Sequence, residues 1–138
     1  MKVAVVMSSA IRDGADFLAD VRALEAAGAE LLMLEGDAPS AHAVAGAVAA
    51  VTHRIRIAMP GGVAEDTLAV LSRGRLVTEQ LDWVRVAVPP TREGWTELLR
   101  AQEAAGAAGI VVAWDPRLID LLRNPEPDDR SDLLMSTG

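Results

Sequence analysis

The chain has 138 residues, the size of a single domain, and is too short for a complete eight-unit β/α barrel of about 250 residues. It has no cysteine, which excludes disulfides, thiolate metal sites and a cysteine nucleophile. Its net charge of −7 argues against general binding of nucleic acid, and no apolar run approaches the roughly 18 residues of a membrane span.

The N-terminal part of the chain predicts a strand, a helix and a second strand. Val3–Met7 is a continuous apolar run, which is typical of a strand buried on both faces of a parallel sheet. Apolar residues then recur at helical spacing between an acidic start at Asp13 and a stop at Gly28. Leu31–Leu34 is the next apolar run and predicts the second strand.

The middle of the chain repeats this pattern. Ser40 is the predicted N-cap of a helix over Ala41–Val51, whose small residues indicate burial. Ile55–Met59 predicts a third strand, and Glu65–Leu71 predicts a short helix that stops near Gly74.

Two further strand–helix units complete the pattern. Trp83–Val88 and Gly109–Ala113 predict strands four and five, with a helix over Glu93–Ala105 between them. Asp115 is the predicted N-cap of a last helix that runs to about Arg123. Five alternations of strand and helix predict an α/β fold with a parallel sheet.

An internal repeat supports this interpretation. Arg22–Ala29 and Arg100–Ala107 are identical at seven of eight positions, and each runs into an apolar strand. The remaining segment, residues 124–138, is rich in proline and acidic residues. We therefore divide the chain into a domain over residues 1–123 and an acidic C-terminal tail over residues 124–138.

Any chemistry is expected at the carboxyl ends of the strands, where ligands bind in parallel α/β folds. The residues there include Ser8, Glu35, Asp37, Met59-Pro60-Gly61 and Trp114-Asp115. Turn geometry selects many of the same residue types, so a purely structural reading stays open for each. Arg73-Gly74-Arg75 lies at the opposite ends of the strands, which in such folds contribute to stability.

Charged side chains in or beside the strands are the least ordinary feature. Glu35 extends an apolar run, and Arg85 interrupts one. Arg85 either pairs with Glu35 in the interior of the sheet or points outward between helices. His42 lies near the strand ends and His53 at the opposite end of its helix. No cluster has the spacing of metal ligands, so we expect no metal site.

Two runs of sequence are similar to the luciferase-like oxidoreductases, which depend on flavin or deazaflavin. Thr52-His53-Arg54-Ile55-Arg56 resembles the Thr-x-Arg-Ile-Arg run that enters the third barrel strand of that family. Leu71-Ser72-Arg73-Gly74-Arg75 resembles its Leu-Ser-Gly-Gly-Arg turn. The resemblance covers most of residues 1–112 and implies a partial TIM-like barrel of about five strands.

The resemblance also implies a cofactor, FMN or a deazaflavin, at the mouth formed by the strand ends. The cofactor-binding residues that it implies are Ser8, Glu35, Asp37, Met59, Pro60 and Gly61. The chain departs from the family because the connection between Arg56 and Ser72 is short and the late phosphate-binding units are absent. No catalytic residue is therefore assigned.

Two functions compete at this point. One is an abbreviated flavin- or deazaflavin-dependent oxidoreductase that transfers hydride at the strand mouth. The other is a non-catalytic small-molecule-binding or assembly subunit derived from that barrel, and a weaker third is a lyase or isomerase with Glu35 as base. Five strands with open edges and an uncovered inner face also predict a homodimer. We expect a cytoplasmic location, because no signal-peptide pattern precedes the first strand.

Overall fold

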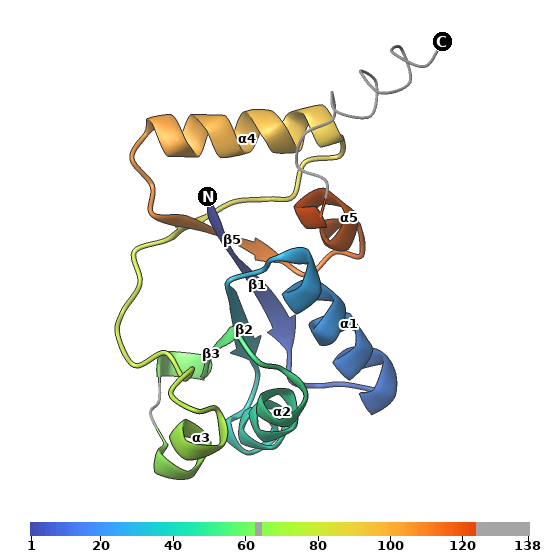
Figure 1. Ribbon diagram of the computed structural model, residues 1–138, viewed down its shortest axis with the longest axis vertical. Helices are drawn as coiled ribbons and strands as arrows, with labels where there is room; N and C mark the ends of the chain where they lie inside the picture. Colours follow the sequence, from blue (N-terminus) through green and yellow to red (C-terminus); the bar gives the residue numbers. More distant parts are fainter. Residues whose placement is uncertain (63–64, 124–138) are drawn as a thin grey trace.

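The structure is a computed structural model, and it describes residues 1–62 and 65–123 (Figure 1). Strands and helices alternate along these residues, as the apolar pattern predicts. Their bounds are β1 Lys2–Ser8, α1 Gly14–Ala27, β2 Leu31–Glu35, α2 Ala38–Val51, β3 Arg56–Ala58, the 3₁₀ turn η1 Pro60–Gly62, α3 Asp66–Leu71, β4 Val84–Arg85, α4 Arg92–Ala104, β5 Gly109–Ala113 and α5 Arg117–Arg123. The acidic tail over residues 124–138 lies outside the described part of the chain.

The strands form one parallel sheet in the order β3-β2-β1-β5-β4, which confirms the predicted α/β fold. β1 is central, since it pairs with β2 through Ala4 and Leu31 and with β5 through Lys2 and Gly109. The first and last strands of the domain are therefore neighbours. No helix in the described residues is long and apolar enough to cross a membrane.

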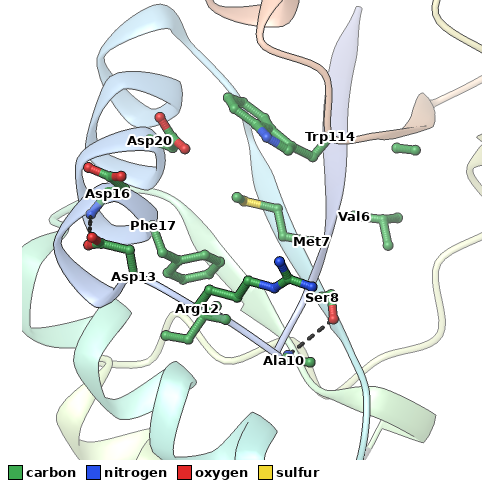
Figure 2. A pocket seen from close by; sticks show the side chains of 12 residues that line it. Val6, Met7, Ser8, Ala10, Arg12, Asp13, Asp16, Phe17, Asp20 and Trp114 are labelled. Carbon is green, nitrogen blue, oxygen red and sulfur yellow. Dashed lines mark hydrogen bonds between the residues drawn. The ribbon is translucent and has the colours of Figure 1, made fainter.

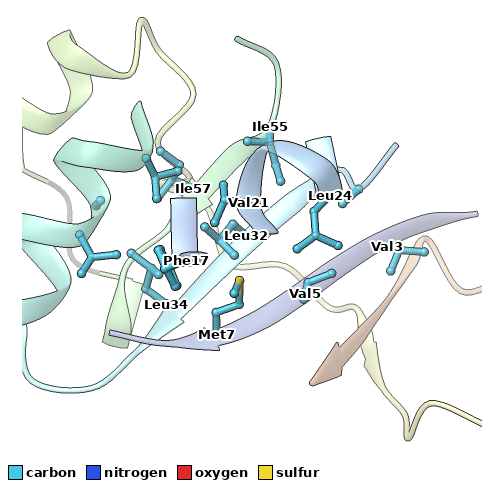
Figure 3. Close-up of a cluster of buried hydrophobic side chains, with 14 of the residues drawn as sticks. Val3, Val5, Met7, Phe17, Val21, Leu24, Leu32, Leu34, Ile55 and Ile57 are labelled. Carbon is cyan, nitrogen blue, oxygen red and sulfur yellow. The ribbon is translucent and has the colours of Figure 1, made fainter. Parts of the chain in front are cut away.

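All five described helices contribute side chains to a cluster on one face of the sheet. Val3, Val5 and Met7 of β1 point to this side and belong to the main buried cluster (Figure 3). The helix residues of the same cluster include Phe17, Val21 and Leu24 of α1, Val44 and Val48 of α2, Leu68 of α3, Trp95 of α4, and Leu118 and Leu121 of α5.

The opposite face, which we call the inner face, carries a second and smaller buried cluster. Its strand residues are those that alternate with the first set, such as Ala4 and Val6 of β1. No helix side chain of the described residues belongs to this cluster. Val77, Leu81 and Trp83 cover it instead, and we call residues 76–83 the inner strap.

The inner strap connects opposite edges of the sheet. Leu76 forms a parallel bridge with Ile57 of β3, and Val77 N–H donates to the Ile57 carbonyl at 2.8 Å. Beyond the strap, Val86 N–H donates to the Val111 carbonyl of β5 at 2.9 Å. The expectation of an uncovered inner face is therefore wrong, because the chain covers that face itself. This removes one reason for the predicted homodimer, which stays a prediction.

Several element boundaries differ from the predicted ones. Asp37, not Ser40, is the N-cap of α2, and its carboxylate accepts hydrogen bonds from the Ser40 backbone N–H and hydroxyl. β4 has only two residues instead of the predicted Trp83–Val88, because Trp83 packs against the inner-face cluster. β3 is likewise shorter than Ile55–Met59.

Arg75 joins the ends of α2, β3 and α3. Its Nη2 donates to the Ala49 and Thr52 carbonyls at the end of α2, at 3.0 and 3.2 Å. Its Nη1 donates to the Thr52 hydroxyl and the Ile55 carbonyl, and its Nε donates to the Ser72 carbonyl. The cation thus satisfies carbonyls that the helix end leaves unpaired, where positive charge is also favourable.

Glu25 anchors the turn that follows α2. Its Oε2 accepts hydrogen bonds from the backbone N–H groups of His53, Arg54 and Ile55, at 2.8, 2.7 and 2.9 Å. Burial raises the pKa of this carboxyl, but the three N–H donors outweigh burial and hold the pKa below its ordinary value. α1 is thereby tied to the start of β3.

Both copies of the internal repeat end in the same way. Gly28 has φ of 106° and Gly106 has φ of 83°, a left-handed conformation that glycine adopts without strain. Each copy then leads into a strand, β2 or β5. The repeat therefore marks equivalent helix-to-strand turns, and Glu25 of the first copy also anchors the turn after α2.

We predict that Arg75→Lys lowers the free energy of unfolding by about 1–3 kcal/mol, because lysine keeps the charge but cannot reach all of these acceptors. Urea denaturation at neutral pH measures the loss. Arg73→Lys is the matched control, since Arg73 is exposed. Equal losses in the two variants would contradict the role given to Arg75.

We also predict that the contribution of Glu25 to stability depends on pH. Because folding lowers its pKa, the contribution is complete above the ordinary pKa of a glutamate and is lost as pH falls through the folded pKa. The difference in unfolding free energy between the wild type and Glu25→Gln should be largest at neutral pH and should shrink in acid. A difference that stays constant with pH would show that the carboxylate charge is not involved.

Candidate functional site

The structure places a cavity at the carboxyl ends of β2 and β3, between the sheet and the inner strap. Its volume is about 590 Å³, and we call it the inner cavity. Four of the six residues implied as cofactor-binding line it: Glu35, Met59, Pro60 and Gly61. Side chains along β2 alternate between the two faces of the sheet. Leu31 and Met33 point to the inner face, and Glu35 therefore points there as well.

An ion pair crosses the rim of the inner cavity. An Nη2 of Arg85 in β4 lies 3.6 Å from an Oε1 of Glu35 in β2. Three strand spacings of about 4.8 Å separate these strands in a flat sheet, so the sheet curls towards its inner face. The Arg85 and Glu35 side chains are 63% and 60% exposed, so the pair lies at a wet rim and not in the interior.

The floor of the inner cavity is apolar and one wall is polar. Leu31, Met33, Ala58, Val77 and Leu81 supply the apolar surface. The polar wall comes from Thr78, Glu79 and Gln80 of the inner strap.

A second ion pair holds this wall in place. Arg56 of β3 donates from Nη2 to Glu79 Oε1 at 2.8 Å, and this bond holds the pKa of Glu79 below its ordinary value. Sequence reasoning missed the Arg56–Glu79 pair and the wall of the inner strap. The sequence does hold one signal for Arg56. It lies two residues before Ala58 in β3, so both side chains are on the inner face.

Asp37 and Ser8 lie outside the inner cavity. The Asp37 carboxylate caps α2, and the hydrogen bonds from Ser40 hold its pKa below the ordinary value. Gly36 precedes it with φ of 132°, and a Cβ there would lie 2.2 Å from Ser9 Oγ, so this turn requires glycine. The Glu35-Gly36-Asp37 run thus combines one cavity residue with two structural ones.

Ser8 lines a different cavity of about 450 Å³ beside the start of α1 (Figure 2), which we call the α1 cavity. Figure 2 shows Met7, Phe17 and Trp114 around it, with Asp20 on α1 and Arg12 on the preceding loop. Ser8 and Glu35 are partners in the β1–β2 register, so a lining residue of one cavity neighbours a lining residue of the other in the sheet.

The two histidines lie outside both cavities. His42 Nδ1 is 2.7 Å from the Ala38 carbonyl within α2, and His53 donates its backbone N–H to Glu25. In the residues that the structure describes, no three histidine, aspartate or glutamate side chains gather in a way that would hold a metal ion.

The two runs that carry the family resemblance are structural. Thr52 and Ile55 in the first run receive the Arg75 guanidinium of the second, and Glu25 receives the backbone N–H groups of the same turn. Neither a scan of protein-family models nor a search of curated proteins gives a match to this chain.

We predict that Gly109→Ala loosens the inner strap. A Cβ at Gly109 would lie 2.5 Å from Cδ2 of Trp83, so the indole must move off the inner face. We expect a loss of about 1–3 kcal/mol in unfolding free energy, measured by urea denaturation. Adding Trp83→Leu to this variant should cost less than the same change in the wild type.

The matched control is Gly46→Ala in α2, where an added Cβ meets no atom within 4 Å. This change should leave stability unchanged or raise it, because alanine favours a helix. Additive effects of Gly109→Ala and Trp83→Leu would contradict the contact.

Proposed function

We propose that the chain is an abbreviated luciferase-like protein that binds a flat heteroaromatic ligand, of the flavin or deazaflavin kind, in the inner cavity. The observation that carries this proposal is the cavity itself, with an apolar floor and the Glu35–Arg85 pair at its rim. The placement of the described helices on one face, with the strand ends opening towards a cavity, supports a partial TIM-like barrel as its frame.

The inner cavity suits the ring of such a ligand. Its volume of about 590 Å³ falls in the range of roughly 300–1,000 Å³ typical of small-molecule sites. Glu35 offers hydrogen-bond acceptors beside the donors of Arg85. This arrangement complements the edge of a flavin ring, where an imide N–H lies between two carbonyl oxygens.

The cavity suits a phosphate poorly. Arg85 is paired with Glu35 and Arg56 is paired with Glu79, so each of these cations already has a carboxylate partner. Glu35 and Glu79 also line the cavity and would repel an anion. These observations support binding of the ring and argue against a phosphate site in the cavity, which favours a ligand whose charged group stays in solvent.

A bound flavin or deazaflavin would supply hydride transfer, and the residues of this chain would orient its ring. One observation favours the second candidate, a binding protein without catalysis. The three charged residues that line the cavity are all in ion pairs: Glu35 pairs with Arg85, and Glu79 pairs with Arg56 outside the lining. Glu35 is thereby engaged, which also disfavours it as the base of a lyase or isomerase.

Titration by fluorescence quenching tests the proposal with riboflavin, FMN and a 5-deazaflavin. We expect the ring to bind and FMN to bind no more tightly than riboflavin. Arg85→Gln should weaken binding roughly tenfold, because it removes charged donors from the rim. Arg22→Gln, a change on the exposed face of α1, is the control with the same loss of charge.

Three results would contradict the proposal. Lack of binding by all three compounds would exclude the ligand class. A clear preference for FMN over riboflavin would show a phosphate site that the paired arginines do not provide. An unchanged affinity in Arg85→Gln would place the ligand elsewhere.

A further inference from the structure

The α1 cavity is separate from the site of the proposed function. Its lining includes Met7 at the end of β1, Phe17 of α1 and Trp114 after β5, which together give a thioether and two aromatic faces (Figure 2). Phe17 is buried, whereas Trp114 is only half-buried and leaves part of its indole in the cavity. No lining residue is shared with the inner cavity.

Two carboxylates stand beside these rings. Asp16 and Asp20 lie one turn apart on the same side of α1, and both line the cavity. Burial raises the pKa of Asp20, and the nearby charge of Asp16 raises it further. Like charges at this spacing destabilise a helix, so a cation placed between them and the rings would relieve a repulsion that the fold retains.

The side chains around the cavity do not supply that cation. Arg12 lines the cavity, but within the described residues it forms no ion pair. In Figure 2 its guanidinium extends towards Ser8, away from Asp20. The third acidic residue, Asp13, uses its carboxylate to cap α1 through the Asp16 backbone N–H at 3.0 Å.

We propose that the α1 cavity is a binding site for an organic ammonium ion with an apolar body. The ammonium group lies between the Asp20 and Asp16 carboxylates and the face of Trp114, where cation–π attraction adds to the ionic one. The apolar body packs on Met7 and Phe17. The cavity lining carries three aspartates against one arginine, which favours a cation over an anion or a zwitterion.

Calorimetric titration of the full chain tests this site with phenethylammonium, and the neutral 2-phenylethanol serves as the matched probe. We expect the ammonium ion to bind at least roughly tenfold more tightly than the alcohol. Asp20→Asn should weaken binding of the ammonium ion roughly three- to tenfold, and Trp114→Leu should weaken it by a similar factor. Asp20→Asn removes a like-charge neighbour, so it is expected to fold.

Arg12→Gln gives the sharpest test, because it removes a positive charge from the cavity. It should tighten binding of the ammonium ion, and Arg100→Gln on the exposed side of α4 is the control with the same loss of positive charge. Weaker binding in Arg12→Gln, equal affinity for the alcohol, or an unchanged affinity in Asp20→Asn would overturn the site. This proposal does not depend on riboflavin binding in the inner cavity.

Discussion

The guanidinium of Arg75 is the point at which the separate units of this fold are held together. It closes the end of α2, reaches the residue before β3 and contacts the end of α3. The acceptors of Arg75 are backbone carbonyls and one hydroxyl from three segments of the chain. Because all of them bind the same guanidinium, their positions are coupled to one another. Arg75 also begins the segment that becomes the inner strap, since its own carbonyl accepts from Ile57 N–H. The contacts of Arg75 lie at the start of β3, whereas the inner cavity lies at the carboxyl ends of β2 and β3. These contacts fix where β3 and the inner strap start.

Most of the fold could be predicted from the sequence because its signals are local. Continuous apolar runs mark the buried strands, and glycines such as Gly28 and Gly106 mark the ends of helices. The inner strap could not be predicted in this way. Residues 76–82 have no helical or strand period, and the place of the strap depends on contacts with residues far away in the sequence, such as Trp83 with Gly109. The covered inner face was missed for this reason.

The candidate site was predicted in part for the same physical reason. Strand alternation and the convergence of strand ends place Glu35, Met59, Pro60 and Gly61 at one cavity. The partner of Glu35 was one of two open alternatives, because the curl of the sheet that brings Arg85 to it is not visible in sequence. The polar wall over Thr78–Gln80 belongs to the inner strap, so it could not be predicted before the position of the strap was known. The residues with the strongest family resemblance shape the frame, while those that line the cavity follow from strand register.

The central position of β1 has a consequence for the order in which the protein is made. β1 is synthesised well before its partner on one side, β5, which ends at residue 113. Until that strand emerges, one edge of β1 has unpaired backbone N–H and C=O groups, which are prone to pairing with other chains. α1, β2 and α2 can form against β1 early, and the sheet is completed only after β5 has been synthesised. The sheet of this domain therefore cannot be completed before β5 is available to pair with β1.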